Sequence, residues 1–440
     1  YYCCRAQILP ATSVGLRLMY VVTFYSFKGG VGRTMALVNT SVALARLGRR
    51  VLVVDFDLEA PGIPSYSVFQ KAMDCKGVVD YVTEYRSMGI APDARDYISP
   101  CDIENNRIWV MPAGCHTRPG YNEALNSIDW QDLYEHRDGY LMFEDLKQQW
   151  KQFDGEGFDY VLIDSWTGHT DVGGICTRQL PDAVMVMFLP NAKNIDGLAP
   201  IISGIRAENK DRNPKIAIEF CPSNVPDLDD ENDILSSQLK RAKKTLKFES
   251  ESSIINHYSS YDVLAQKAFV LARPNSKLSK QYEKLRSSIV ALNYDDPEGA
   301  RVALKRLPAE YERARRESHT KAWGEVRNKT ADIRSRHPTD GEIAFLASRI
   351  LSEIGDSAGE IEALNAAIDL NYERNRAYLA RAFTYSSIGK QEEAKADLRA
   401  VVASPDVSIF ELGPALQILQ EIDRDWTEIL GQVLRRADLD

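Results

Sequence analysis

The sequence contains no Cys-x-x-Cys pair and no regular spacing of histidines. Its seven cysteines and six histidines are scattered, a pattern that suits neither a disulfide framework nor a zinc site. No apolar run approaches the roughly 18 to 20 residues that cross a bilayer. Positive charge is not in excess either, because the formal net charge is −9, and this disfavours a chain-wide role in coating nucleic acid. We therefore expect a cytoplasmic protein with reduced thiols.

The first residues of the chain are unusual. The sequence begins at Tyr1, and Met19 directly precedes the first strong strand pattern. Residues 1–18 lack the charged start and the long apolar stretch of a secretory signal. We expect translation to begin at Met19 and residues 1–18 to be a non-native or disordered extension, with a short ordered arm as the alternative.

Residues 19–293 alternate short apolar runs with helical patterns. Several of the runs are rich in Val and Ile without in/out alternation, which is typical of strands buried on both faces of a parallel sheet. This alternation predicts a mostly parallel, doubly wound α/β domain. The predicted strands are Tyr20–Tyr25, Arg50–Asp55, Arg107–Met111, Tyr160–Asp164, Ala183–Leu189 and Lys215–Cys221, and the clearest helices are Thr34–Leu47, Tyr140–Phe153, Ile195–Glu208 and Ser279–Leu292.

Residues 297–440 have little strand signal and are rich in Ala, Leu, Glu and Arg at helical spacing. Two stretches repeat at a period of 34 residues, and Ala377–Val402 resembles a tetratricopeptide repeat. Because one such unit cannot bury its apolar face, we expect an all-α repeat domain of stacked helical pairs. An unrelated helical bundle is the alternative. The matching positions are Gly355 and Gly389, Leu364 and Leu398, and Ile368 and Val402.

The strongest motif is a glycine-rich loop between the first strand and the first helix. Glycines let backbone N–H groups approach phosphate oxygens, and the N-terminus of the following helix adds a favourable dipole. Thr34 stands where a hydroxyl can ligate Mg²⁺. The pattern predicts a phosphate-binding loop made of Lys28, Gly29, Gly30, Val31, Gly32, Arg33 and Thr34.

This loop resembles the deviant P-loop of the MinD/ParA family, GKGGxGK[ST], in a variant subgroup with KGGVGR. The resemblance covers about residues 20–292. It implies bound ATP and Mg²⁺, and a homodimer in which Lys28 acts on the phosphates of the partner subunit's nucleotide. Two positions depart, since Phe27 replaces the leading glycine and Arg33 replaces the P-loop lysine. A planar guanidinium is not equivalent to an ammonium, so nucleotide binding is expected and hydrolysis is the doubtful step.

Further motifs follow in the order that the family shows. Asp55 and Asp57 end the second strand, and carboxylates at i and i+2 of an extended segment both point toward the pocket. By resemblance, Asp57 positions the attacking water and belongs to the Mg²⁺ site, Asp164 holds Mg²⁺ through water, and Gly168 donates its N–H to the γ-phosphate. Asp164 has a second interpretation, because aspartates often end strands and cap turns.

Base recognition is predicted less sharply. By resemblance, Asn224 and Pro226 follow the strand whose end contacts adenine, and Pro190-Asn191 lies near the γ-phosphate or the dimer interface. An ordinary Pro/Asn turn explains both segments equally well. ATP is favoured over GTP only by the family association.

Arg301–Arg336 holds eleven Lys/Arg against five Asp/Glu. Such a stretch can bind nucleic acid, but it lacks the interleaved aromatic residues of a single-strand platform. Solvated helix faces in repeat domains have the same composition, so nucleic-acid binding is not favoured. The last residues do not form the amphipathic membrane anchor found in MinD proteins.

Together these patterns predict an ATPase that acts as a nucleotide-dependent, dimerising switch. Its C-terminal repeats would engage a protein partner, and a prokaryotic signalling or antiviral conflict system is suggested by association alone. The alternatives are a non-hydrolysing, nucleotide-bound scaffold or sensor and a DNA-partitioning ParA-like ATPase. A bacterial tyrosine kinase is a further alternative, although its usual tyrosine-rich tail is not seen.

Overall fold

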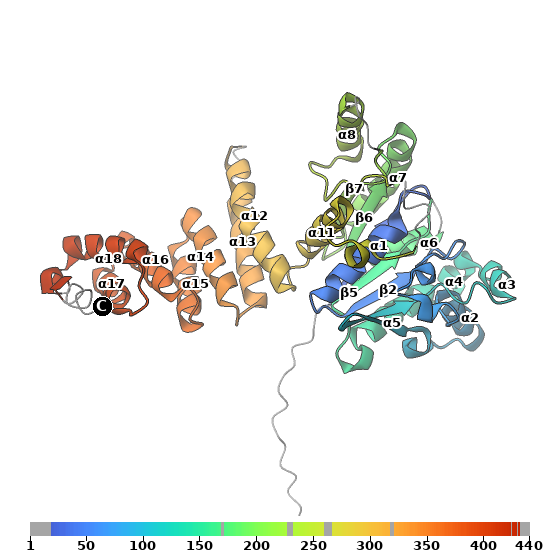
Figure 1. The fold of residues 1–440 in the computed structure, drawn as a ribbon, viewed down its shortest axis with the longest axis horizontal. Helices are drawn as coiled ribbons and strands as arrows, with labels where there is room; N and C mark the ends of the chain where they lie inside the picture. The colour runs from blue at the N-terminus through green and yellow to red at the C-terminus, as the bar shows by residue number, and fades with distance from the viewer. Residues whose placement is uncertain are drawn as a thin grey trace, which may run out of the picture. The chain divides into compact units, whose positions relative to one another are not determined.

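The computed structural model describes residues 19–168, 171–226, 232–258, 266–316, 321–423, 425–428 and 430–431. The expected extension, residues 1–18, lies outside the described residues. The chain divides into two compact units, one that ends at Ile289 and one that begins at Val290 (Figure 1). Each unit is built around its own core.

The first unit contains a seven-stranded sheet in the order β3-β4-β2-β5-β1-β6-β7. Neighbouring strands run parallel except β3 and β4, which are antiparallel. The predicted α/β fold is therefore confirmed, with one edge strand that the sequence patterns did not indicate. The strands are β1 (Tyr20–Tyr25), β2 (Val51–Asp55), β3 (Ser99–Ile103), β4 (Asn106–Met111), β5 (Tyr160–Asp164), β6 (Ala183–Phe188) and β7 (Ala217–Pro222).

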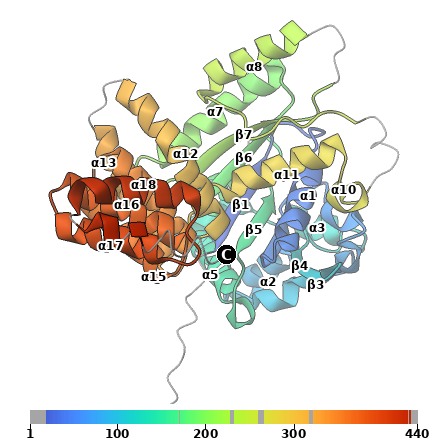
Figure 2. The same cartoon turned by 60° about the vertical axis from the view of Figure 1, so that its left-hand side comes forward.

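Helices cover both faces of this sheet (Figure 2). Helix α1 lies on β1, β2, β4 and β5, and α10 packs on α1. On the other face, α2 and α5 join a core cluster that contains Val21, Leu52 and Val161 but no residue of α1. The helices are α1 (Arg33–Arg46), α2 (Val78–Met88), α3 (Tyr121–Asn126), α4 (Trp130–His136), α5 (Gly139–Lys151), α6 (Asp171–Gly174), α7 (Ala192–Glu208), α8 (Asn232–Leu246), α10 (Phe269–Ala272) and α11 (Lys277–Val290), with a π-helical turn η5 (Ile175–Gln179) and short 3-10 turns η1 (Ile63–Ser65), η2 (Gln70–Ala72), η3 (Ala94–Tyr97) and η4 (Phe153–Gly155).

The register of the central strands brings their carboxyl ends together at one edge of the sheet. Both β2 and β5 are buried along their whole length, as their Val- and Ile-rich sequences predict. Asp55 on β2 pairs in register with Asp164 on β5, and Asp164 also stands opposite Phe24 on β1. The carboxyl ends of these three strands therefore meet where the loop after β1 begins.

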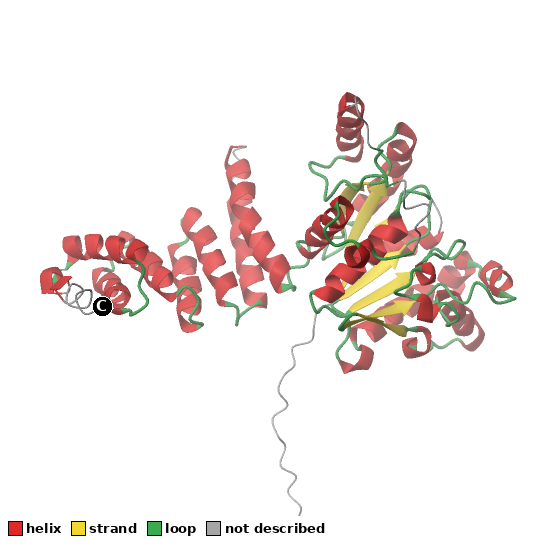
Figure 3. Cartoon of the chain, in the orientation of Figure 1, coloured by secondary structure: helices red, strands yellow, loops and turns green. Residues whose placement is uncertain are grey.

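The described part of the second unit is entirely helical (Figure 3). Successive helices pack on one another, and small side chains such as Ala344, Ala363 and Ala382 are buried between them. Gly355 and Gly389 adopt left-handed φ values of 75° and 80° at equivalent turns of two helix pairs. The tetratricopeptide type stays a prediction. The helices are α12 (Pro297–Arg316), α13 (Lys321–Arg336), α14 (Gly341–Glu353), α15 (Ser357–Asp369), α16 (Arg374–Ser387), α17 (Gln391–Ala403) and α18 (Ile409–Ile422).

Several described basic side chains of the stretch Arg301–Arg336 pair with acidic side chains. Arg301 pairs with Glu342 at 2.7 Å and also with Asp340, Arg327 pairs with Asp356 at 2.7 Å, and Arg336 pairs with Asp295 at 2.8 Å. The charges of these arginines are thus balanced within the unit.

Within the described residues, no helix is both long and apolar enough to cross a bilayer. The described cysteines are free thiols: Cys75, Cys101, Cys115, Cys176 and Cys221.

Candidate nucleotide-binding site

The glycine-rich loop leads from the end of β1 into the first turn of α1. Gly30 and Gly32 adopt left-handed φ values of 76° and 79°, which explains why glycine occupies both positions. A Cβ atom added at Gly29 or Gly30 would meet no atom within 4 Å. Gly32 directly precedes α1 and, as a glycine, supplies no side-chain cap to the first N–H groups of the helix. Such a loop presents backbone donors to an anion, as a phosphate requires.

A cavity of about 470 Å³ opens in front of this loop. One wall is made by the loop and the start of α1, and the other by residues from the segments around Asn224, Ile255 and Leu278. Clefts of this size hold cofactor-sized ligands. Loop and cavity together fit a nucleotide whose phosphates lie on the glycines.

Beneath the loop, Arg33 is clamped by two carboxylates. Its Nε donates to Asp164, its Nη2 donates to Asp57 Oδ2 at 2.6 Å, and its Nη1 donates to Ser26 Oγ at 3.3 Å. Burial opposes the charge of this side chain, but Asp164 and Asp57 outweigh burial and raise the pKa of Arg33 above its ordinary value. The guanidinium therefore serves as an internal counter-ion, and its predicted contact with phosphate stays a prediction.

The residues predicted to hold Mg²⁺ lie together. Thr34 Oγ1 donates to Asp164 Oδ2 at 2.6 Å, and Asp57 lies across Arg33 from Asp164. Among the described residues, no three His, Cys, Asp or Glu side chains are grouped so that they could hold a metal. Mg²⁺ usually keeps several waters and takes one or two carboxylates plus phosphate oxygens. Thr34 and Asp164 fit an ion that arrives with a nucleotide, provided that Arg33 releases its hydrogen bond to one oxygen of the Asp164 carboxylate.

The two aspartates at the end of β2 are not equivalent. Asp55 is fully buried and accepts from the N–H groups of Asp57 at 3.1 Å and Ile63 at 3.3 Å. Burial, reinforced by the charges of Asp164 and Asp57, raises the pKa of Asp55 well above its ordinary value. Only Asp57 lines the cavity. The prediction that both carboxylates face the pocket was therefore wrong for Asp55, which instead fixes the loop that follows β2.

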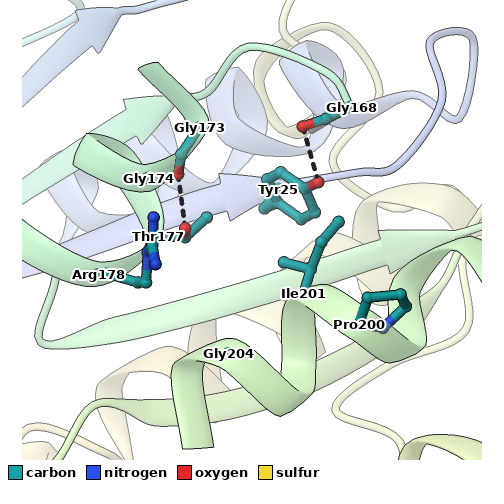
Figure 4. Close-up of a pocket in the computed structure, with 9 residues that line it drawn as sticks. All are labelled: Tyr25, Gly168, Gly173, Gly174, Thr177, Arg178, Pro200, Ile201 and Gly204. Atoms are coloured by element: carbon teal, nitrogen blue, oxygen red, sulfur yellow. Dashed lines mark hydrogen bonds between the residues drawn. The ribbon is translucent and has the colours of Figure 1, made fainter. Parts of the chain in front are cut away.

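Gly168 does not line the nucleotide cavity but lines a smaller one of about 110 Å³ (Figure 4). The hydroxyl of Tyr25, the last residue of β1, donates to the carbonyl of Gly168 at 3.1 Å. On the far side, Thr177 in η5 donates to the carbonyl of Gly173. The side chain at the end of β1 thus binds the backbone of the segment that follows β5. The predicted contact of the Gly168 N–H with a γ-phosphate stays a prediction.

Lys28 does not line the nucleotide cavity. Lys193, in the first turn of α7, lies close to Lys28 and lowers the pKa of Lys28. The reason for this approach lies one residue earlier, because a Cβ atom at Gly197 would come within 2.2 Å of the Phe27 ring. Lys193 is one helical turn before Gly197 and so shares its face. Phe27 and Gly197 together dock α7 on the loop, and two cations gather outside the cavity.

Of the two residues predicted to contact the base, Asn224 lines the cavity and Pro226 does not. Asn224, with a left-handed φ of 55°, donates from Nδ2 to the carbonyl of Gly30 at 3.1 Å. Its Oδ1 lies 2.6 Å from His257 Nδ1, so both ends of the amide are already engaged by the protein. Pro226 is exposed and outside the cavity lining. Asn191 caps α7 by accepting from the N–H of Asn194 at 3.0 Å, which supports its ordinary turn role.

His257 and Tyr258 line the cavity but were missed by the sequence reasoning. Their segment reaches the site because it pairs with the chain after β7, where the His257 N–H donates to the carbonyl of Val225 at 2.7 Å. No spacing of histidines signals this position. The pairing between distant segments is a tertiary contact, and a single sequence does not show it.

Sequence comparisons found proteins that are similar to the first part of this chain. Residues 19–218 match the family model described as "AAA domain". The iron-sulfur cluster carrier protein of Methanocaldococcus jannaschii is 24% identical over 166 residues, which are 38% of this chain and 47% of that protein. The sporulation initiation inhibitor protein Soj of Bacillus subtilis is 24% identical over 201 residues, which are 45% of this chain and 70% of Soj. The chain spans about half the length of the carrier protein.

Solved structures of similar proteins were also found. McdA of Cyanothece without nucleotide is 16% identical, with a TM-score of 0.47, and covers 62% of this chain and 100% of its own. The septum site-determining protein MinD of Pyrococcus horikoshii, complexed with Mg-ADP, is 18% identical, with a TM-score of 0.46, and covers 62% of this chain and 96% of its own.

Proposed function

We propose that this protein, whose first domain is a P-loop domain of the MinD/ParA type, is an ATP- and Mg²⁺-dependent switch that hydrolyses ATP. The observation that carries the proposal is the open glycine loop over a cavity of about 470 Å³, with Thr34 and Asp164 joined beside it. Bound Mg²⁺ would neutralise phosphate charge, while Asp57 is the cavity carboxylate available to orient a water. We assign residues 19–293 to this domain.

We further propose that two copies pair when ATP is bound. Lys28 and Lys193 lie together but outside the cavity that would hold their own nucleotide. Two like charges side by side favour a nearby anion, and a nucleotide carried by a second copy supplies one. ATP must favour the pair through contacts that ADP lacks, because a ligand without differential affinity shifts no equilibrium.

The second unit is proposed to pass this state to a protein partner. Residues 297–440 would act as tetratricopeptide-like repeats, and helical repeats mainly bind proteins or peptides. Large apolar side chains are exposed on its helices, with Phe383 on α16 at 51% and Phe410 on α18 at 86% exposure. A role in a prokaryotic signalling or antiviral conflict system is a hypothesis from the domain combination.

One observation favours a second candidate, a nucleotide-bound sensor or scaffold that does not hydrolyse ATP. Arg33 engages both Asp57 and Asp164, the two carboxylates that hydrolysis would use. A DNA-partitioning role is less supported, because Arg301, Arg327 and Arg336 of the basic stretch already pair with acids.

ATP turnover with mass tracked by light scattering tests the proposal. We expect the wild type to release phosphate and to double its mass with ATP but not with ADP. Lys28→Ala should abolish both effects, and Asp57→Asn should abolish turnover while nucleotide binding persists. Lys210→Ala, an exposed lysine just beyond α7, is the matched control.

The outcomes separate the candidates. A wild type that binds ATP and doubles its mass, yet releases no phosphate over several hours, would establish the sensor and remove the enzyme. A wild type that binds no nucleotide would remove both.

A further inference from the structure

The wall of the cavity opposite the glycine loop contains a short relay of polar groups. It starts at the carbonyl of Gly30, which accepts from Asn224 Nδ2 at 3.1 Å. It continues from Asn224 Oδ1 to His257 Nδ1 over 2.6 Å. His257 is also held by its backbone, because its N–H donates to the carbonyl of Val225 at 2.7 Å. The imidazole is therefore fixed at both its ring and its main chain.

This relay determines the tautomer of His257. A carbonyl only accepts hydrogen bonds, so the Asn224 atom that faces Gly30 is the amide nitrogen and the one that faces His257 is the amide oxygen. An amide oxygen also only accepts, so His257 Nδ1 carries a proton and donates. In a neutral imidazole the other nitrogen, Nε2, is then an acceptor.

His257 lines the cavity and is linked to the glycine loop through Asn224. Apolar and aromatic residues line the same cavity, among them Ile255, Tyr258 and Leu278. Aromatic faces stack on nucleobases. A nucleotide with its phosphates on the glycines would therefore bring its base to this wall.

We propose that His257 selects adenine by accepting a hydrogen bond at Nε2 from the 6-amino group, and that Asn224 is the positioning residue that fixes the required tautomer. Adenine carries a donor at position 6, whereas guanine and hypoxanthine carry an acceptor oxygen there. Two acceptors cannot bond, and a mismatched polar pair that loses water is unfavourable. This inference rests on the proposed nucleotide-binding function and names the residues that select its base.

Calorimetric titration of the full chain at pH 8 with Mg²⁺ and either ADP, GDP, IDP or N6,N6-dimethyl-ADP tests the inference. Diphosphates avoid turnover, and the dimethyl analogue keeps the adenine ring but has no hydrogen to donate. We expect ADP to bind roughly tenfold more tightly than the other three, which is the order of one hydrogen bond made or mismatched.

Two variants separate recognition from packing. His257→Phe keeps a ring but removes the acceptor, and should weaken ADP roughly 3- to 10-fold while GDP changes less than about twofold. Asn224→Gly keeps the left-handed backbone and frees the imidazole, so the ratio of ADP to GDP affinity should fall. A change at Asn224 that only loosened the loop would weaken all four ligands alike. His136→Phe, at an exposed histidine of α4, is the matched control.

The results that overturn the inference differ from those that overturn the proposed function. Equal affinities for ADP, GDP and dimethyl-ADP, or an equal loss for all of them in His257→Phe, would remove His257 from base recognition and leave nucleotide binding intact. If none of the four nucleotides binds, the proposed function itself fails and the inference with it.

Discussion

Arg33 occupies the loop position at which the resembled family has lysine, and its side chain makes contacts that an ammonium does not reproduce. The planar guanidinium reaches Asp57, Asp164 and Ser26 through three different nitrogens, which matches the fork geometry of arginine. A lysine has one nitrogen at the end of its chain and would satisfy one carboxylate well. With arginine in place of lysine, the stability of the folded protein therefore depends on the positive charge of Arg33.

Replacing this counter-ion should destabilise the nucleotide-free protein. In Arg33→Met, Asp57 and Asp164 keep their charges below the loop without a cation, and breaking a buried pair in this way costs about 3 kcal/mol of the free energy of unfolding. We take the lower end of the usual range because the Asp57 side chain is 16% exposed. Urea unfolding in EDTA measures the change, and added Mg²⁺ should restore part of it.

Arg95→Met is the control for this measurement, since the Arg95 side chain is 68% exposed beside Asp93. Such pairs contribute less than about 1 kcal/mol. An Arg33→Met protein as stable as the wild type would mean that the two carboxylates do not need the guanidinium.

At this scale the sequence identified the unusual residues but not their contacts. Phe27 and Arg33 stand out against the family pattern, and Thr34, Asp57 and Asp164 were predicted to gather. That Arg33 would turn to the carboxylates depends on the register that pairs Asp55 with Asp164. His257 gave no signal at all, because its place follows from a contact with Val225.

At the scale of elements, α7 docks on the loop because a large side chain at Phe27 fills the space left by the missing side chain of Gly197. Phe27 is large where the family loop has glycine, and Gly197 is the position on α7 that receives its ring. This contact brings the first turn of α7, with Lys193, next to Lys28. The glycine-rich loop and the start of α7 are therefore packed directly against each other.

Filling that space should be unfavourable. Gly197→Ala adds a Cβ atom 2.2 Å from the Phe27 ring, and overpacking of this kind costs about 1–3 kcal/mol. Gly204→Ala on the same helix meets no atom within 4 Å, so it should be stabilised by about 0.8 kcal/mol through helix propensity. Thermal unfolding of both variants measures the opposite signs.

The double variant Phe27→Ala/Gly197→Ala provides the decisive comparison. Because the methyl group fits the space that the ring leaves, its loss of stability should be smaller than the sum of the two single losses. Strict additivity would show that the two side chains do not compete for the same space.

The elements themselves were largely predictable. Six strands and four helices were predicted from apolar runs and helical spacing, and all are present with only their ends displaced. Strand β3 was missed because its sequence, Ser-Pro-Cys-Asp-Ile, alternates exposed and buried residues and contains a proline. Strands at a sheet edge need only one apolar face, so their signal is weak.

At the scale of the whole molecule, the two units have separate cores. The candidate nucleotide site lies wholly within the first unit. A ligand that binds only the folded form of one unit stabilises that unit by mass action. The units should therefore respond differently to nucleotide.

We expect two transitions in differential scanning calorimetry of the full chain. ADP with Mg²⁺ at about 100 times its dissociation constant should stabilise the first unit by about 2.7 kcal/mol and leave the second transition unmoved. The same titration with His257→Phe should shift the first transition less. A single transition that moves as a whole would show instead that the two units unfold together.

Finally, both edges of the sheet are closed to further strands. Along β7, the N–H groups of Ser252 and Ile255 donate to the carbonyls of Phe220 and Pro222 at 2.9 Å. At the other edge, β3 carries Pro100, which has no N–H to offer, and Asp102, which binds Lys71 at 3.1 Å. Prolines and charges at edges block the strand-by-strand growth that leads to fibrils. These edges disfavour open-ended polymers of the chain, so high expression should leave the protein free of amyloid.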